Sequence, residues 1–305
     1  MRNRSRGLAG CSSDGAALRK EDAPFQFRRL RAALGAEIVD LDLSRPINDE
    51  TCAAVRRVFV ESNGLLVFRN QRITPEQHIA FSQRFGPLMI HVLDKFLLPG
   101  HPEILRVSNV IENGEPIGLG DAGRIWHSDL SYMTEPSLGS LLYALEIPKE
   151  GGDTSFANLS AAYDALPVEI KQRLDGKSAV HSYSHSYAKF GGSRWRPKLT
   201  QKQKDRVAEV VHPVVRTHPE TGRKTLFVNE GFTSRMVDVP EAESRKLLKF
   251  LFAHSIQPQF VYRHRWQDHD LLFWDNRCTI HLAHGCPPQL RRHMHRTTVK
   301  GDAPY

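Results

Sequence analysis

The segment Trp126–Tyr132, with the sequence WHSDLSY, carries side chains that could bind a metal ion. Aromatic and polar residues alternate along it without a run of helix formers, which predicts a β-strand. On a strand, side chains two residues apart point to the same face, so His127 and Asp129 would lie side by side. One imidazole and one carboxylate are two-thirds of the 2-His-1-carboxylate arrangement, which holds Fe(II) and leaves coordination positions open.

The same spacing recurs at His101/Glu103 and at His218/Glu220, where it carries less weight. A proline separates the two residues of each pair, and proline cannot donate to a strand ladder, so both pairs suit a loop or a strand end. Structural histidines are also commoner than ligands, so a metal site needs a third ligand from another strand. His281, at the end of the WDNRCTIH sequence, is the candidate.

Short strands separated by a few helices are predicted along most of the chain. Helix signals are capping residues and apolar spacing, and strand signals are alternation and β-branched or aromatic runs. The predicted helices are 49–62 with Asn48 as cap, 75–86, 160–166, 167–174, a basic one after Thr200, and 240–255. The predicted strands are two within 27–43, then 65–68, 89–93, 104–110, 140–147, 154–157, 181–187, 211–217, 225–228, 260–266, 270–276 and 292–299. This order favours a β-sandwich or jelly roll with peripheral helices over a parallel α/β sheet.

Residues 118–123 read GLGDAG, a literal GxGxxG. A dinucleotide site would need a strand before this motif and a helix after it. Here Glu115-Pro116 precedes the motif and the His127 segment follows it. We therefore interpret the motif as a loop at the mouth of the site rather than as a Rossmann fingerprint.

The composition is that of an ordinary globular protein, with 305 residues, 40% of them hydrophobic and 25% charged. Residues 1–24 are rich in Arg, Ser and Gly without an apolar core, which predicts a disordered basic tail before a single catalytic domain at 25–305. No apolar run is long enough for a membrane span. The four cysteines form no CxxC or disulfide-rich pattern, which favours a cytoplasmic setting.

The formal net charge of +8 could indicate a nucleic-acid partner. However, the basic residues are scattered, apart from the tail, the stretch 196–206 and Arg291/Arg292. No RNP, helix-turn-helix or zinc-finger pattern accompanies them. An enzyme that attracts small anions explains the charge equally well, so we expect a small-molecule partner and neither nucleic acid nor membrane.

Six motifs stand in a fixed order between residues 27 and 305: WHSD, GGDT, HPVVRTHP, LFVNEGFTSR, WDNR..IH and MHRTT. Together they resemble the taurine dioxygenase family of Fe(II)/2-oxoglutarate-dependent oxygenases, which includes chlorophenoxyacetate dioxygenases. The family fold is a double-stranded β-helix, a form of jelly roll. The resemblance implies an oxidoreductase that uses Fe(II), 2-oxoglutarate and O2, and that hydroxylates a small organic anion with release of succinate and CO2.

Carried over by position, the family's iron ligands fall on His127, Asp129 and His281. The 2-oxoglutarate anchor resembles Arg292, helped by the hydroxyl of Thr154 in GGDT. Arginine suits this role because it stays charged and its planar fork can bind a carboxylate bidentately. Four residues after Arg292 on the same predicted strand, Arg296 matches an arginine near both the cosubstrate and the acidic group of the substrate.

The substrate pocket of the family matches His91 and Phe232, beside Arg296. Two positions depart from taurine enzymes: Asp94 stands where they have tyrosine, and Gly123 where they have asparagine. A carboxylate near an anionic substrate would repel it, which argues against taurine itself. The motifs look more like the chlorophenoxyacetate branch, and an alkylsulfonate, a sulfate ester or an aryloxyalkanoate all stay open as substrate.

Other interpretations of the same residues stay open. Cys278, His281, His284 and Cys286 are all competent zinc ligands, although their spacing would strain a tetrahedral site. The chain could also be a non-catalytic jelly-roll binder of small anions. Phe232 and Thr154 have plain alternatives as a core aromatic and a turn residue. The family often forms dimers or tetramers, so a homo-oligomer is expected from the resemblance.

Overall fold

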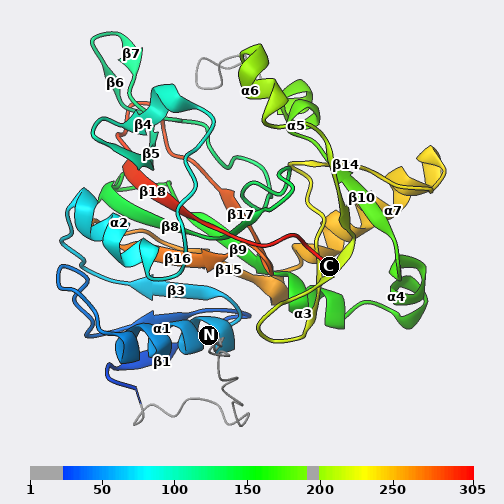
Figure 1. Cartoon of the computed structure of the whole chain (residues 1–305), viewed down its shortest axis with the longest axis horizontal. Coiled ribbons are helices and arrows are strands. Elements are labelled where there is room, and N and C mark those ends of the chain that lie inside the picture. Colours follow the sequence, from blue (N-terminus) through cyan, green and yellow to red (C-terminus); the bar gives the residue numbers. More distant parts are fainter. Residues whose placement is uncertain (1–22, 191–198) are drawn as a thin grey trace, which may run out of the picture.

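The structure, a computed structural model, describes residues 23–190 and 199–305. The predicted tail at 1–24 therefore lies almost entirely outside the described residues, as does the Gly191-Gly192 pair. The described part is rich in strands, with helices at its periphery (Figure 1). This agrees with the predicted class of fold.

A large sheet of eight strands is one of the two central sheets. All neighbouring pairs are antiparallel except β2 and β3, which run parallel. Their order across the sheet is β1 (Phe27–Arg29), β2 (Ala36–Ile38), β3 (Leu65–Phe68), β16 (Leu271–Asp275), β8 (Ser137–Glu146), β18 (His293–Lys300), β5 (His101–Ser108) and β4 (Leu97–Leu98).

A smaller antiparallel sheet packs against the inner face of the large one. Its strands are, in order, β15 (Val261–His264), β9 (Thr154–Asn158) and β17 (Thr279–Ala283). Phe156 of β9 shares a buried cluster with Leu272 and Trp274 of β16 and with Met294 of β18. The two sheets therefore enclose a common core, the arrangement expected of a double-stranded β-helix.

Strand alternation explains how the large sheet separates two cores. Leu272 and Trp274 point inward to the small sheet, whereas Leu271 and Phe273 belong to a second cluster on the outer face. Successive side chains of a strand point to opposite faces, so a strand covered on both sides is apolar throughout. On the outer face the ring of Phe273 stacks on Phe59 of α1, with centroids 4.0 Å apart.

Helices cover both outer faces, as Figure 1 shows, with α1 and α2 beside the large sheet and α3 and α7 on the opposite side. The predicted cap of α1 is confirmed, because Asn48 accepts from the Thr51 amide. In α2, Thr74 forms a capping box with Gln77. The helices are α1 (Asp49–Glu61), α2 (Pro75–Gln83), α3 (Leu159–Asp164), α4 (Val168–Leu174), α5 (Tyr183–Phe190), α6 (Gln201–Asp205) and α7 (Glu241–Ser255), with 3-10 turns at Asp94–Phe96 and Pro258–Phe260.

Three small sheets extend the fold beyond the two central ones. The largest of them joins β11 (Val210–Pro213), β10 (Ser178–His181) and β14 (Thr233–Met236). The other two are hairpin-like pairs, β12 (Val215–Thr217) with β13 (Lys224–Leu226), and β6 (Ile111–Glu112) with β7 (Glu115–Pro116). The GxGxxG motif follows β7 as turns and bends without a helix, so a dinucleotide fingerprint is excluded here.

Three predicted strands are wrong, and the first two are WHSDLSY and 181–187. The WHSDLSY segment is a buried turn in which Leu130 has a φ of +57°, and its one strand-like feature is the bridge between His127 and His281. Residues 127–132 are all buried, whereas a half-buried strand would alternate. The predicted strand 181–187 ends at His181 and becomes helix α5, because an alternating HSYSHSY sequence also places Tyr183, Ser186 and Tyr187 on one helical face.

The third wrong strand is 89–93, and the start of one helix also differs. Residues 89–93 form no strand, and this stretch is tied to β18 by the bridge from Leu88 to Val299 and by the bond from the Met89 amide to the Thr298 carbonyl. Helix α3 is capped by Asn158 rather than by Ser160. Both corrections arise because pairing with a distant strand, not local propensity, sets where these elements begin.

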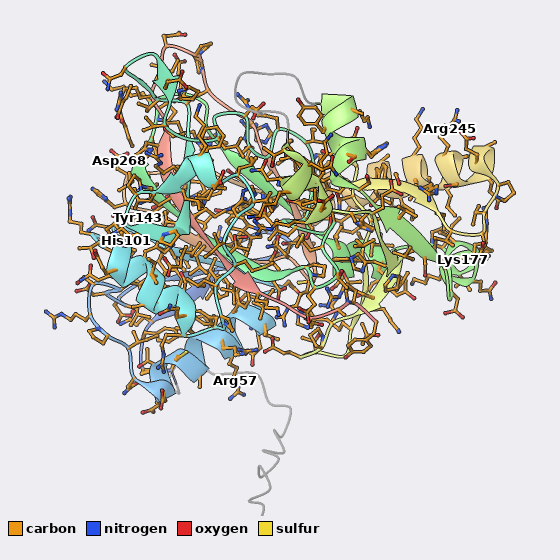
Figure 2. The ribbon with its side chains drawn as sticks, turned by 45° about the horizontal axis from the view of Figure 1, so that its top comes forward. Arg57, His101, Tyr143, Lys177, Arg245 and Asp268 are labelled. Carbon is orange, nitrogen blue, oxygen red and sulfur yellow. The ribbon has the colours of Figure 1, made fainter. Side chains whose placement is uncertain are left out.

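The basic side chains are spread over separate edges of the molecule. Figure 2 shows Arg57 on α1 and Arg245 on α7 projecting outward at positions far apart. Many surface arginines pair with acids, as Arg57 does with Glu61 and Arg245 with Glu241. Among the described residues, no helix is long and apolar enough to cross a membrane.

Candidate metal centre and active site

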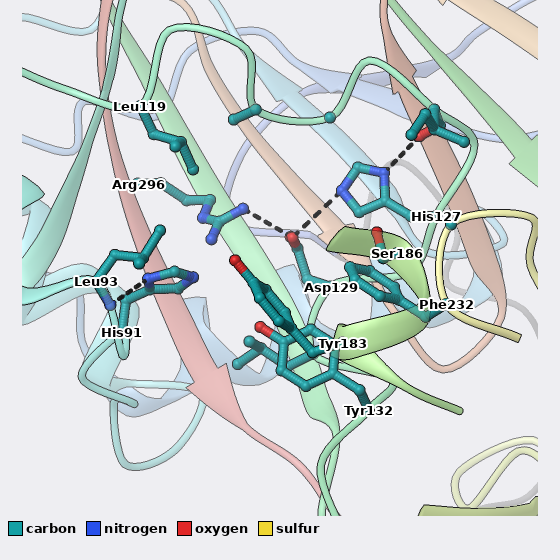
Figure 3. A pocket seen from close by; sticks show the side chains of 15 residues that line it. His91, Leu93, Leu119, His127, Asp129, Tyr132, Tyr183, Ser186, Phe232 and Arg296 are labelled. Atoms are coloured by element: carbon teal, nitrogen blue, oxygen red, sulfur yellow. Dashed lines mark hydrogen bonds and ion pairs between the residues drawn. The ribbon is translucent and has the colours of Figure 1, made fainter. Parts of the chain in front are cut away.

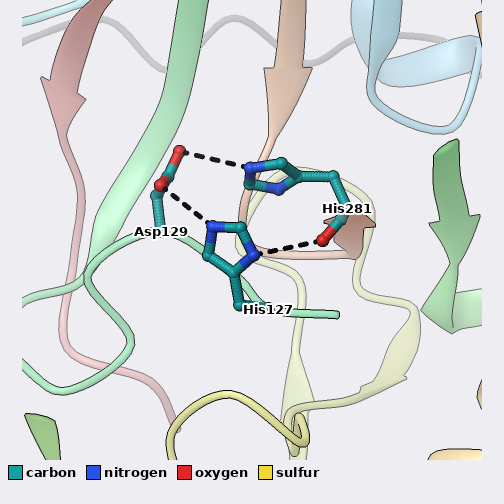
Figure 4. Close-up of side chains that lie close together, drawn as sticks. All are labelled: His127, Asp129 and His281. Carbon is teal, nitrogen blue, oxygen red and sulfur yellow. Dashed lines mark hydrogen bonds and ion pairs between the residues drawn. The ribbon is translucent and has the colours of Figure 1, made fainter. Parts of the chain in front are cut away.

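His127, Asp129 and His281 converge at one buried point between the two sheets (Figure 4). Their ligand atoms all lie within 4.8 Å of one another. The His127 Nε2 atom is 3.6 Å from Asp129 Oδ1, and the His281 Nε2 atom is 3.9 Å from Asp129 Oδ2. Two imidazoles and one carboxylate on one side of a point could hold a divalent metal ion as a facial triad.

Pairing of the backbone brings the two histidines together. The His127 amide donates to the His281 carbonyl at 3.1 Å, and the His281 amide donates back to the His127 carbonyl at 2.8 Å. The predicted third ligand is therefore opposite the first, although one partner is a turn and the other is strand β17. Asp129 reaches the same point from the turn itself, not from a ladder position.

The His127 ring is oriented by two carbonyls. Its Nδ1 lies 2.8 Å from the Ile125 oxygen and 3.1 Å from the His281 oxygen, so Nδ1 carries the proton and donates. Nε2 is then left with its lone pair facing Asp129, the form that binds metals. Burial and the neighbouring His127 hold the pKa of His281 well below its usual value, which keeps the His281 imidazole neutral.

The Asp129 carboxylate is gripped on both oxygens. Arg296 donates to Oδ1 at 2.7 Å, and the Ser140 hydroxyl donates to Oδ2 at 2.7 Å. Burial raises the pKa of this carboxyl, but Arg296, His281 and His127 outweigh that effect and hold the pKa well below the usual value. The carboxylate is therefore ionised, as a metal ligand must be.

A small cavity beside the triad contains the three residues expected to bind the cosubstrate. Thr154, Arg292 and Arg296 line it together with His127 and His281. Arg292 is buried just before β18, and burial lowers the pKa of its guanidinium to about 10, so it stays charged at neutral pH. Its Nε finds no partner among the described residues. This cavity can therefore bind a carboxylate.

Thr154 begins β9 with its hydroxyl already fixed. Its Oγ1 accepts from the indole Nε1 of Trp266 at 2.9 Å, which leaves the hydroxyl proton to be donated elsewhere. Arg124 adds a second positive charge nearby, because it lines an adjoining cavity with Arg292 and donates to the His284 carbonyl at 2.7 Å. Sequence reasoning did not single out Arg124, whose position before the His127 segment is the one available signal.

A second pocket opens on the other side of the triad (Figure 3). His91, Phe232 and Arg296, the three residues expected to bind substrate, all line it. His127 and Asp129 reach its inner end. Arg296 thus lies between the two cavities and contributes to both.

His91 acts in this pocket as a neutral donor. Its Nδ1 accepts from the Leu93 amide at 3.1 Å, so the ring proton is on Nε2. Burial lowers the pKa of His91 to about 3, and the nearby Arg296 adds to the effect. His91 can therefore donate a hydrogen bond to an anion, but it brings no positive charge to the pocket.

Aromatic rings form the wall opposite Arg296. The Tyr132 ring centroid lies 4.7 Å from Phe232 and 5.2 Å from Tyr183. Tyr183 comes from α5, the helix that was mistaken for a strand, so nothing in its sequence context predicted a pocket position. Leu93, Ile125 and Leu130 complete an apolar surface.

The two departures from taurine enzymes have different outcomes. Asp94 is exposed, accepts from the Lys95 amide, and is not among the residues that line the pocket, so the expected repulsion of an anion is wrong. Gly123 lines both cavities with a φ of +73°, and a Cβ there would meet His127 Cε1 at 3.1 Å. That backbone conformation favours glycine.

The zinc alternative is wrong for the described residues. Cys278, His281, His284 and Cys286 do not gather there, and the two groups with metal-ligand geometry are the triad and His218/Asp275/Cys278. In the second group, Asp275 accepts from His218 Nε2 at 3.1 Å and from Arg277 Nη2 at 2.6 Å, and is already satisfied as an ion pair. His284 Nε2 instead lies 2.8 Å from the Ser155 hydroxyl.

Comparisons with known proteins agree with this geometry. A sequence model described as "Taurine catabolism dioxygenase TauD, TfdA family" matches residues 26–298. The alpha-ketoglutarate-dependent 2,4-dichlorophenoxyacetate dioxygenase of Cupriavidus pinatubonensis is 35% identical over 285 residues, which cover 90% of this chain and 97% of that protein. Pentalenolactone F synthase of Streptomyces arenae is 35% identical over 294 residues, covering 93% and 96%. The crystal structure of AAD-2 with Mn(II) and N-oxalylglycine has a TM-score of 0.76 and 32% identity, covering 92% and 98%.

These similarities extend over nearly the whole of each chain, and the match in structure confirms the jelly-roll fold. The relative from Cupriavidus pinatubonensis is a dioxygenase by name, which favours an enzyme over a non-catalytic binder. The family uses Fe(II), 2-oxoglutarate and O2, and the residues at the triad and in the adjoining cavity fit those groups. The chain belongs to the taurine catabolism dioxygenase TauD, TfdA family of alpha-ketoglutarate-dependent dioxygenases.

Proposed function

We propose that this chain hydroxylates a small organic anion, using Fe(II), 2-oxoglutarate and O2, with release of succinate and CO2. In this proposal His127, Asp129 and His281 hold the iron. The observation that carries it is the convergence of these three side chains between two cavities that share Arg296. One cavity suits a dicarboxylate and the other an organic acid.

The cosubstrate would be held by Arg292 and Thr154. The charged fork of Arg292 can grip the distal carboxylate of 2-oxoglutarate bidentately, and the free hydroxyl proton of Thr154 can join it. When bound, the iron supplies the oxidising chemistry through the reaction of 2-oxoglutarate with O2. The residues around it bind and orient the reactants and exclude water, and no protein acid or base is required.

The substrate would be an acid with an apolar, ring-sized body. Arg296 and the Nε2–H of His91 can donate to its acidic group, while Tyr132, Tyr183 and Phe232 contact the rest. Asp129, which Arg296 already pairs, is the one acidic side chain among the described residues lining this pocket. An ammonium tail such as that of taurine would find no counter-charge, and burying it unpaired is costly.

An aryloxyalkanoate therefore fits better than taurine, and apolar alkylsulfonates and sulfate esters come next. Sequence identity does not distinguish these substrate classes, because two relatives at 35% identity have names that refer to different substrates. The substrate class rests on the pocket chemistry alone.

The test is release of succinate from 2-oxoglutarate in the presence of Fe(II), ascorbate and air. The panel would hold aryloxyalkanoates, alkylsulfonates, alkyl sulfates and taurine, with a His127→Ala variant as control. We expect aryloxyalkanoates to stimulate release most and the variant to lose it. No release from iron-loaded protein would contradict the oxygenase, and stimulation by taurine alone would contradict the substrate class.

We further propose that residues 25–305 act as one catalytic unit. The core between the sheets supports this, because it takes side chains from Leu34 through Met294. A cytoplasmic location stays a prediction, which the free cysteines Cys52, Cys278 and Cys286 support. A homo-oligomer also stays a prediction, based on the family.

A further inference from the structure

The side-chain amide of Asn276, in the WDNR motif, is at the centre of a buried hydrogen-bond network around Asp129. Its Oδ1 accepts from the Asp129 amide at 3.2 Å and from the indole Nε1 of Trp274 at 3.0 Å. Its Nδ2 donates to the hydroxyls of Ser137 at 2.8 Å and Ser140 at 3.1 Å. All these residues are almost completely buried.

The direction of each bond in this network is determined. Backbone and indole N–H groups can only donate, so the Asn276 oxygen must face them and its NH2 group must face the two serines. A serine hydroxyl has one proton. Because Asn276 donates to the Ser140 oxygen, the proton of that hydroxyl is free to point at Asp129 Oδ2, 2.7 Å away.

Ser137 is bonded in the same way but to a different atom. It accepts from the other hydrogen of the Asn276 amide and donates to the backbone carbonyl of Asp129 at 2.9 Å. Ser137 therefore holds the turn, whereas Ser140 holds the carboxylate. The two serines come from the same strand, β8, and are equally buried.

The carboxylate plane is set from two sides, with Ser140 on Oδ2 and Arg296 on Oδ1. Each carboxylate oxygen has two lone-pair sites, and one of them on each oxygen is used by these donors. The remaining sites are available on the side where the Nε2 atoms of His127 and His281 lie 3.6 and 3.9 Å away. Without a donor on Oδ2, the carboxylate could rotate about its terminal bond, a soft torsion.

We propose that Asn276 and Ser140 are positioning residues that aim the Asp129 carboxylate at the metal. Asn276 acts through Ser140 by orienting its hydroxyl proton, and Trp274 fixes Asn276. Removing such outer-shell partners typically lowers metal affinity by roughly 10 to 100-fold. This inference rests on the proposed iron site, but it concerns how that site is held rather than which reaction it performs.

The test compares Ser140→Ala with Ser137→Ala as a matched control. Apparent Kd values for Mn(II) would be measured by EPR titration of the apoprotein, and the visible spectrum of the Co(II) form would report ligand geometry. We expect Ser140→Ala to weaken Mn(II) binding on the order of 10 to 100-fold and to change the Co(II) spectrum. Ser137→Ala should stay within about threefold of the wild type, although both variants lose one buried hydroxyl and should lose similar thermal stability.

Asn276→Asp provides a second, nearly isosteric test. The new carboxylate can only accept, so it would take the Ser140 proton away from Asp129 and add a like charge beside it. We expect a loss of Mn(II) affinity at least as large as in Ser140→Ala. Wild-type affinity in folded Asn276→Asp protein would contradict the proposal.

The outcomes separate this inference from the proposed function. Equal losses in Ser140→Ala and Ser137→Ala, or wild-type affinity in Ser140→Ala, would overturn the positioning role while leaving the iron site in place. Wild-type protein that binds Mn(II) no better than His127→Ala would instead remove the proposed iron site itself. If Asn276→Asp does not fold, the pair of serine variants still decides.

Discussion

At the scale of single residues, Arg296 is the side chain on which the two cavities depend. It lines both of them, and its Nη1 pairs with Asp129. Its Nε has no partner among the described residues, and a guanidinium carries five N–H donors. Arg296 can therefore pair with the Asp129 carboxylate and still donate to the acidic group of a substrate, whereas Arg292 lines the first cavity but not the substrate pocket.

Arg292→Lys tests the proposed anchor for 2-oxoglutarate. Lysine keeps the charge but cannot bind a carboxylate as a planar fork. Losing one charge-assisted hydrogen bond of about 1.5–3 kcal/mol corresponds to a rise of roughly 10 to 100-fold in the apparent KM for 2-oxoglutarate. Succinate release at varied 2-oxoglutarate would measure it, and metal affinity should not change.

The matched control is Arg291→Lys, one residue earlier. Arg291 is exposed and pairs with Glu146 at 2.9 Å, outside the cavity that contains Arg292. The apparent KM of Arg291→Lys for 2-oxoglutarate should equal that of the wild type. An unchanged KM in Arg292→Lys, or an equal rise in both variants, would contradict the role of Arg292.

At the scale of elements, the side chains of β16 alternate between the site on one face and the packing against α1 on the other. Trp274 points inward, where it lines the cavity that contains Thr154 and Arg292 and donates to the side chain of Asn276. Phe273, its neighbour, points outward and stacks on Phe59 of α1. One strand thus contributes to the site through one face and anchors a helix through the other.

Phe273→Ala should therefore destabilise the fold without changing the site. Emptying a fully buried aromatic position costs about 3–5 kcal/mol, which urea unfolding would measure. Mn(II) affinity of the folded variant should stay within about twofold of the wild type. Phe250→Ala on the exposed side of α7 is the control and should cost about 0.5 kcal/mol or less. A large loss of metal affinity in Phe273→Ala would show that the two faces are coupled.

At the scale of the whole molecule, buried histidines should make stability depend on pH. Burial lowers the pKa of His78, on the buried face of α2, to about 4. Burial, with His293 and His78 nearby, lowers the pKa of His295 on β18 to about 3. Because an unfolded histidine titrates near 6.5, the unfolded chain gains protons below that pH while the folded chain does not.

The free energy of unfolding should therefore fall as the pH is lowered from about 6.5 towards 4, and these two histidines should have no effect above 6.5. Each contributes up to about 1.4 kcal/mol per pH unit within that window. Thermal unfolding of the apoprotein between pH 8 and 4.5 would measure it. His78→Gln should make the slope shallower, and an unchanged slope would contradict the assignment to His78.

Much of the site could be predicted from the sequence. His127, Asp129 and His281 were found by residue type and ordered motifs, and the structure brings them together although the strand expected for the first two is a turn. Arg292 and Thr154 were found in the same way and line one cavity. The prediction of these ligands was unaffected by the wrong strand, because residue type and motif order do not depend on secondary structure.

Most of the fold followed from local patterns. Apolar spacing and capping residues indicated α1, α2 and α7, and apolar runs indicated β3, β8 and β16. These signals are local because a helix or strand repeats its exposure every 3.6 or 2 residues. Where two periods share the same residues, as in HSYSHSY, the pattern could not choose, and packing made α5 a helix.

By itself, then, the sequence determined the class of fold, the candidate iron ligands and Arg292 as the candidate cosubstrate arginine. Only the tertiary structure decided which aromatic side chains join His91, Phe232 and Arg296 in the pocket, and which residues bond to Asp129. Tyr183 of α5 lines the pocket, whereas Asp94 lies outside it. Asn276 accepts from the Asp129 amide although the two residues are 147 positions apart in the chain. Such contacts arise from the way two sheets close around one core, and no local period along the chain encodes them.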